Sequence, residues 1–123
     1  MKHIILTNNK TIVDDENQIV LVPGEFRDVL VEARNYIHLG HRLKVSPLPA
    51  SIRMFYSPVR SVVISKEPSE IDSDSVIMIE NAIEMYDKSL GERNIDYSNL
   101  NDYEIIDRQL LQSALTELRT AEL

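Results

Sequence analysis

Residues 18–40 decide the fold, and they read QIVLVPGEFRDVLVEARNYIHLG. The segment opens with an apolar run over residues 19–22, which predicts a short strand because it is brief and rich in β-branched residues. After Pro23 and Gly24, apolar residues recur three and four positions apart, which predicts the buried face of an amphipathic helix. That face consists of Phe26, Val29, Leu30, Ala33 and Ile37. Gly40 is expected to end the helix, because glycine adopts the left-handed conformation at little cost.

Two more apolar runs predict strands outside that segment, at residues 4–6 and 61–65. All three runs are continuous rather than alternating, as is typical of strands that are covered on both faces in a parallel sheet. The strand at 18–22, the helix after it and the strand at 61–65 are therefore expected to form a right-handed parallel crossover. The connection over residues 9–17 is short for a crossover, so antiparallel pairing of the first two strands is the alternative.

Two further helices are predicted in the second half of the chain. The first begins at the capping cluster of residues 72–75 and ends before Gly91. Its apolar stripe is Val76, Ile79, Ile83, Tyr86 and Leu90. The second begins near Asn101 or Asp102, and its stripe is Ile106, Leu110, Ala114 and Leu118, widened by Leu111 and Leu115. Because this face is so wide, we expect it to contact more than the sheet of its own domain.

These elements predict an α/β fold. We expect a small, mostly parallel sheet of three or four strands with flanking helices, similar to half of a Rossmann fold, plus a C-terminal helix. The length of 123 residues fits a single domain. Its core is expected over residues 1–91, followed by a linker and the last helix over residues 92–123.

The composition of the chain indicates the cellular compartment in which the protein is expected. The chain contains no cysteine, which excludes disulfides and thiolate metal ligands and fits a reducing compartment. Its start becomes polar too soon for a secretory signal, and no run approaches the ~20 apolar residues that a membrane helix needs. We therefore expect a cytoplasmic protein without a membrane partner.

Charge is distributed unevenly along the chain. Residues 1–66 carry nine Lys or Arg and six Asp or Glu, whereas residues 67–123 carry four and fourteen. The overall net charge of −7 disfavours nucleic acid as a partner. No acid occurs between Glu32 and Glu67, which leaves room for one local anion site in that interval.

The segment from His41 to Pro58 is the irregular part of this interval. Pro47 and Pro49 prevent it from forming one regular element, while apolar residues such as Phe55 distinguish it from a solvated linker. Loops of this length are uncommon and often functional. We expect this one to pack over one end of the sheet.

His38 and His41 stand three positions apart, a spacing that can bring two imidazoles to one face of a helix. Gly40 is expected to end the helix between them, and no third ligand is nearby. We therefore expect no metal site, and two histidines that are exposed or bonded to the backbone.

Polar residues follow each predicted strand, and ligands of open α/β sheets bind beyond the carboxyl ends of the strands. Asn amides suit a small polar ligand, although Asn is also a common turn former. The helix opened by Gly24 offers N–H groups to an anion, and Lys66 adds a cation. The candidate ligand-binding residues are Thr7, Asn8, Asn9, Gly24, His38, His41, Ser46, Ser51, Arg53, Ser65 and Lys66. The alternative is that the basic residues only keep a loop soluble or pair with acids elsewhere.

Three short motifs resemble the GrdX family. They are the turn Thr7-Asn8-Asn9, the run from His38 through Gly40 and His41 to Leu43, and the segment from Pro47 and Leu48 to Ser51. The resemblance covers about residues 3–90. It implies a small protein encoded alongside the glycine, sarcosine and betaine reductase components of amino-acid-fermenting anaerobes, and it implies no catalytic residue.

The sequence leaves three functions open. By the resemblance, we expect a non-catalytic accessory protein of a reductase system that binds a protein component or a small anionic metabolite and uses no cofactor. One alternative is a small enzyme acting on a carboxylate or phosphate, with His41 as acid and base and Arg53 or Lys66 as anion clamp. The other is a homodimeric structural module with its interface on the last helix, and exposed edges of a small sheet also favour a dimer.

Overall fold

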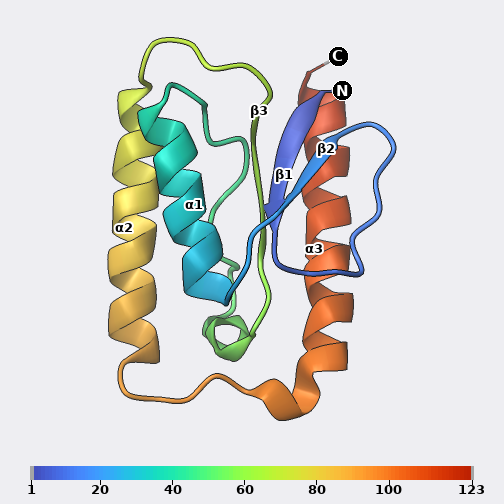
Figure 1. The fold of residues 1–123 in the computed structure, drawn as a ribbon, viewed down its shortest axis with the longest axis vertical. Coiled ribbons are helices and arrows are strands. Elements are labelled where there is room, and N and C mark those ends of the chain that lie inside the picture. The colour runs from blue at the N-terminus through green and yellow to red at the C-terminus, as the bar shows by residue number, and fades with distance from the viewer. Residues whose placement is uncertain (1, 123) are drawn as a thin grey trace.

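The computed structural model describes residues 2–122, which form strands, α-helices and short 3₁₀ helices (Figure 1). The elements in chain order are β1 (His3–Thr7), β2 (Gln18–Leu21), α1 (Phe26–His38), η1 (Ile52–Tyr56), β3 (Ser61–Ser65), α2 (Ser73–Leu90), η2 (Tyr97–Asn99) and α3 (Leu100–Ala121). The α/β class and the C-terminal helix are therefore confirmed. None of the helices in the described part of the chain has the length and apolarity needed to cross a membrane.

The strands form one mixed sheet in the order β2-β1-β3. β1 pairs with β2 in parallel, with Leu6 beside Val20. β1 pairs with β3 antiparallel, with Ile5 beside Val63. The predicted parallel crossover from β2 through α1 to β3 is therefore wrong, and so is the alternative of an antiparallel pair of β1 and β2. The sheet is small as expected, but it is not the mostly parallel sheet of a Rossmann-like half.

The physical reason lies in the connection between α1 and β3. This segment first runs along the outer edge of β3, where Ser65 N–H donates to Arg42 O at 2.8 Å. Further along, Lys44 N–H donates to Val63 O at 2.9 Å. The chain then continues through η1 and turns back between η1 and β3, so it has travelled the length of the sheet before β3 begins (Figure 1). The segment thus joins both ends of the sheet, instead of packing over one end as predicted, and β3 runs antiparallel to β1.

The two ends of the sheet consequently carry different residues. We call the end where β1 and β2 finish and β3 begins the Asn8 end, and the opposite one the Ser65 end. The turn after β1 and the loop after β2 lie at the Asn8 end. Ser65 and Lys66 lie at the other end, so the expectation that all strands present their carboxyl ends together is wrong.

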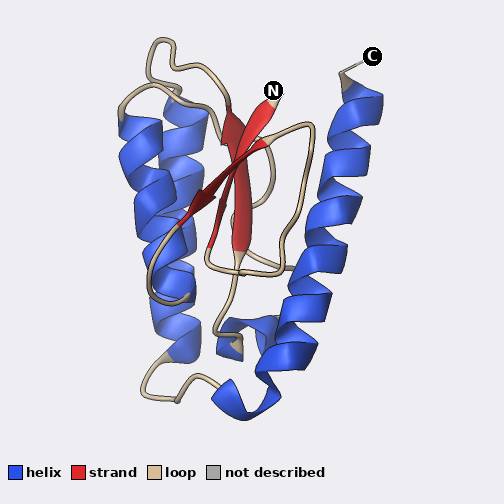
Figure 2. Ribbon diagram, turned by 45° about the vertical axis from the view of Figure 1, so that its right-hand side comes forward, coloured by secondary structure: helices blue, strands red, loops and turns tan. Residues whose placement is uncertain are grey.

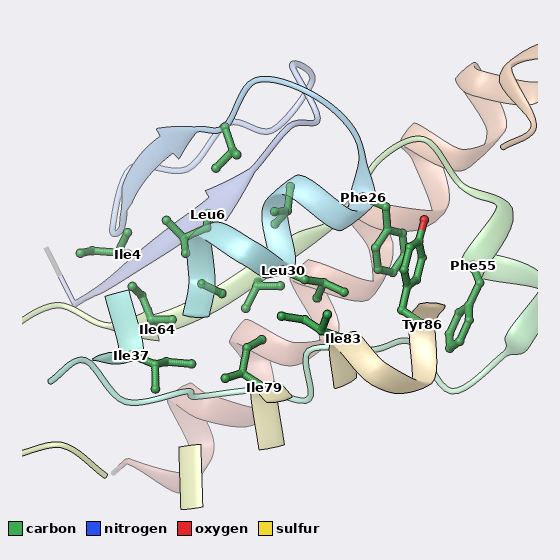
Figure 3. Packing of buried hydrophobic residues seen from close by; sticks show 14 residues of the cluster. Ile4, Leu6, Phe26, Leu30, Ile37, Phe55, Ile64, Ile79, Ile83 and Tyr86 are labelled. Carbon is green, nitrogen blue, oxygen red and sulfur yellow. The ribbon is translucent and has the colours of Figure 1, made fainter. Parts of the chain in front are cut away.

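α1 and α2 cover one face of the sheet (Figure 1). Phe26, Leu30 and Ile37 of α1 are fully buried, as the periodicity predicts. Figure 3 shows Phe26 beside Tyr86 of α2 and Phe55 of η1. The rings of Phe26 and Tyr86 stack with their centroids 4.6 Å apart. These aromatic contacts hold η1 against the two helices.

Both ends of α1 are capped, the first by side chains and the second by a glycine. Asp28 Oδ2 accepts the N–H of Glu25 at 2.7 Å, and the Glu25 side chain completes a capping box. At the other end Leu39 is the C-cap, and Gly40 follows with a φ of 108°. Gly40 therefore ends the helix as predicted.

α3 covers the other face of the sheet (Figure 2). It packs through Leu111 and Leu115 against apolar side chains of β1 and β3. The stripe predicted to face the core lies partly outside it, because Ile106 and Leu110 are 38% and 39% exposed. The residues expected only to widen the face therefore form the buried contact.

β2 is an edge strand and is only half covered. Gln18 and Leu21 are exposed, while Ile19 and Val20 are partly buried. The prediction that strands with continuous apolar runs are covered on both faces holds for β1 and β3 and is wrong for β2.

Candidate functional site

The turn after β1 ties separate parts of the chain together at the Asn8 end. Asn8 Nδ2 donates to Gly24 O at 3.0 Å and to Pro58 O at 2.8 Å. Asn8 Oδ1 accepts the N–H of Arg60 at 2.9 Å. The amide of Asn8 thus joins the loop after β2 to the loop before β3, and both of its donor hydrogens are engaged in the fold.

The neighbours of Asn8 form a buried relay of hydrogen bonds that ends on α3. Asn9 N–H donates to Thr7 Oγ1 at 2.9 Å, and Thr7 Oγ1 lies 2.7 Å from Ser61 Oγ. Ser61 Oγ donates to Asp107 Oδ2 at 2.7 Å. Because a hydroxyl has a single hydrogen, Thr7 must be the donor to Ser61. The relay therefore has one direction, from the β1 turn to the carboxylate of Asp107.

Asp107 anchors α3 to the sheet. Besides the Ser61 hydroxyl, it accepts the Ser61 N–H at 2.9 Å and Asn9 Nδ2 at 3.0 Å. Only 1% of the surface of Asp107 is exposed, and a carboxylate this buried needs such partners. Sequence reasoning missed this residue. The available signal was an acid spaced four and eight positions before Leu111 and Leu115, on the face that α3 buries.

Arg60 is a second buried charge at the Asn8 end, with 7% of its surface exposed. Its Nε donates to Pro47 O and its Nη2 to Ser46 O, both at 2.9 Å. Burial lowers the pKa of Arg60, and the charge of Asp107 opposes that shift. A guanidinium keeps its charge in proteins, so Arg60 is a cation fixed beneath residues 44–50.

A groove of about 610 Å³ lies between residues 44–50 and α3, and Arg60 lines it. Apolar side chains from both sides form most of its walls, including Leu48 and Leu118. Lys44 lines the groove on one side, and Glu117 lines it on α3. The groove therefore combines apolar walls with a few polar groups and a buried cation, which is the usual make-up of a small-molecule site.

One nitrogen of the Arg60 guanidinium is left unbonded by the fold. Nη1 has no hydrogen-bond partner among residues 2–122, because the bonds of the guanidinium use Nε and Nη2. Nη1 is also not fully buried, since the buried side-chain atom without a partner in that range is the hydroxyl of Tyr86. The two N–H groups of Nη1 are thus not used by the fold within residues 2–122.

Other candidate residues lie at the Ser65 end. His41 Nδ1 lies 2.8 Å from Ser65 O, and Ser65 Oγ accepts the Arg42 N–H at 2.8 Å. Lys66 is exposed. His41 and the turn of residues 7–9 therefore lie at opposite ends of the sheet, so they do not share a pocket.

The histidines point to different partners. His38 is exposed with its Nε2 3.7 Å from Glu80 Oε1, whereas His41 is buried against Ser65 O. Across residues 2–122, no three His, Cys, Asp or Glu residues come close enough together to hold a metal ion.

The remaining candidates lie nearer the Asn8 end. Ser46 lines the groove, while Ser51 and Arg53 are exposed at η1 and do not line it. Gly24 precedes α1 with a φ of 109°. Two of the N–H groups expected to be free there, those of Glu25 and Asp28, are met by the carboxylates of Asp28 and Glu25 in the capping box.

Comparison with known proteins gives one match. The sequence model of a family described as GrdX-like protein matches residues 4–116. That range includes Arg60, Asp107 and most of the groove. No curated protein and no solved structure matches the chain.

Proposed function

This chain belongs to the GrdX-like protein family, and we propose that it is a non-catalytic accessory protein of a glycine, sarcosine or betaine reductase system in the cytoplasm. In this proposal it binds a carboxylate, carried by a small metabolite or by a protein component, in the groove between residues 44–50 and α3. The observation that carries the proposal is Arg60, a buried cation that lines that groove and whose Nη1 has no hydrogen-bond partner among residues 2–122.

The setting of Arg60 supports a carboxylate as the ligand. Hydrogen bonds from a guanidinium to a carboxylate are charge-assisted and stronger than neutral ones. The bonds from Arg60 to Pro47 O and Ser46 O fix the guanidinium before any ligand arrives, which lowers the entropy cost of binding. The apolar walls suit the carbon part of an organic anion, and Lys44 adds a second cation to the lining.

We propose a non-catalytic role because the two best candidates for a nucleophile and its base, Ser61 and His41, are engaged elsewhere. Ser61 lines the groove, but its hydroxyl donates to Asp107 in a structural relay. His41 lies at the other end of the sheet and bonds to a backbone carbonyl. A nucleophile needs a base within hydrogen-bond reach, and Ser61 has no imidazole beside it.

Titration calorimetry tests the small-molecule arm, with acetate, glycine, sarcosine and betaine as probes and sulfate as a comparison anion. We expect at least one carboxylate to bind saturably and Arg60→Met to abolish binding. The matched control is Lys66→Met, which removes a cation at the Ser65 end and should bind like the unmodified protein. Arg60→Lys keeps a positive charge in the groove. Because this variant is less disruptive than Arg60→Met, it shows whether a loss of binding follows from the lost charge or from a folding defect. Equal loss of binding in both methionine variants would contradict the assignment to the groove.

Capture from a lysate of an anaerobe that ferments glycine tests the protein arm. We expect the unmodified protein and Lys66→Met to retain a reductase component and Arg60→Met to lose it. Added acetate should compete with that component for the groove. If no carboxylate binds and no reductase component is captured, the proposed function is wrong.

A further inference from the structure

The two outer edges of the sheet differ in whether their backbone groups are hydrogen-bonded by the rest of the chain. The outer edge of β3 is closed by its own chain, because Ser65 N–H bonds to Arg42 O and Lys44 N–H bonds to Val63 O. The outer edge of β2 has no such cover within residues 2–122. It also lacks the charged residues and proline that usually protect an open edge, since residues 18–21 read QIVL.

The register shows which backbone groups of β2 are open. Val22 N–H donates to Thr7 O at 2.8 Å, and Val20 lies beside Leu6 in the parallel pair. In such a pair alternate residues turn both backbone groups to the same side. Val20 therefore bonds to β1, whereas Ile19 and Leu21 turn their N–H and C=O groups outward.

These outward groups are complementary to a second copy of themselves. In an antiparallel pair, opposite residues exchange both hydrogen bonds. A two-fold axis through Val20 places Ile19 opposite Leu21 of the second copy, and Leu21 opposite Ile19. All the open N–H and C=O groups of β2 are then paired, in the self-complementary arrangement that a symmetric dimer requires.

We propose that two copies of this chain associate through antiparallel β2 strands, which joins their sheets into one continuous sheet. This inference does not depend on the proposed function, because the groove and the β2 edge use different residues. The exposed side chain of Leu21, 59% accessible in the single chain, packs beside Ile19 of the second copy. The side chains of Ile19 and Val20 pack against the two core clusters, one on each face of the sheet, so the part of β2 that stays open at the outer edge is its backbone.

The short contact predicts a reversible dimer that depends on concentration, because small interfaces are weak and transient. Each chain carries a formal net charge of −7, so the copies repel each other at low ionic strength. Added salt screens that repulsion and should increase the dimer fraction.

Sedimentation velocity up to millimolar protein tests the proposal, with Leu21→Pro and Leu21→Thr as matched variants. Proline removes the outward N–H of Leu21, which bonds to no group within residues 2–122, while threonine keeps it. We expect the unmodified protein and Leu21→Thr to dimerise and Leu21→Pro to stay monomeric with an unchanged circular dichroism spectrum. A monomer at all concentrations, or equal dimerisation of the two variants, overturns the proposal.

Hydrogen exchange on the unmodified protein provides a second readout if Leu21→Pro does not fold. The amides of Ile19 and Leu21 should exchange more slowly as concentration rises. The amide of Val20, bonded to β1, serves as the internal reference and should be protected throughout. Exchange of Ile19 and Leu21 that is independent of concentration overturns the proposal.

Discussion

Replacement of Asp107 by alanine tests how α3 is held on the sheet. The carboxylate accepts hydrogen bonds from Ser61 N, Ser61 Oγ and Asn9 Nδ2, and all of these groups are buried. A buried donor left without a partner costs about 1–3 kcal/mol, so the variant, which leaves three such donors, should lose about 3–9 kcal/mol. Arg60 also loses the charge that opposes its desolvation, which adds to the cost. Against a typical total stability of about 5–15 kcal/mol, this loss is large.

Urea denaturation followed by circular dichroism measures the effect. With a slope of about 2 kcal/mol per molar urea, a loss of about 4 kcal/mol lowers the midpoint by about 2 M. The matched control is Asp15→Ala, at an exposed acid in the loop before β2, which should change the free energy of unfolding by less than about 0.5 kcal/mol. A cost for Asp107→Ala as small as that of the control would refute the reasoning.

Two more substitutions test local features of the fold. Gly40→Ala should cost about 1–3 kcal/mol, because φ is 108° and a Cβ would lie 2.0 Å from Ser69 O; Gly91→Ala, whose Cβ has room, should cost less in the same urea assay. Tyr86→Phe should leave stability at neutral pH unchanged or raise it, because the hydroxyl is buried and has no hydrogen-bond partner among residues 2–122. Burial raises the pKa of Tyr86 from 10.0 to about 12. The unfolded chain therefore ionises this tyrosine first, so the free energy of unfolding is unaffected by it below pH 10 and falls as pH rises from 10 toward 12. Thermal unfolding across that range should show this loss in the unmodified protein and not in Tyr86→Phe, and parallel curves would contradict it.

The helices could be predicted from the sequence because their periodicity is strong. The stripe from Phe26 to Ile37 is buried as expected, and Gly40 ends α1. The direction of β3 could not be predicted in this way. Its apolar run is the same in either orientation, and the orientation is set by the segment of residues 41–60, which returns along the sheet before β3 starts.

The candidate site was harder to predict for a related reason. Arg60 belongs to the acid-free interval seen in the sequence, but its burial depends on carbonyls of Pro47 and Ser46 that the folded loop brings to it. Asp107 meets Ser61 across more than forty residues of chain. Such pairs depend on tertiary contacts that a sequence pattern does not contain. The Thr7-Asn8-Asn9 motif could be recognised in the sequence, but its role in tying the loops and α3 to the sheet could not be predicted.

In the proposed function, Arg60 Nη1 binds a carboxylate in the groove. This binding is tested most directly by following the guanidinium resonances of Arg60 by NMR while acetate or glycine is added. We expect a saturable change at Arg60 and none at Arg53, which is exposed outside the groove. An unchanged Arg60, or an equal change at Arg53, would contradict it.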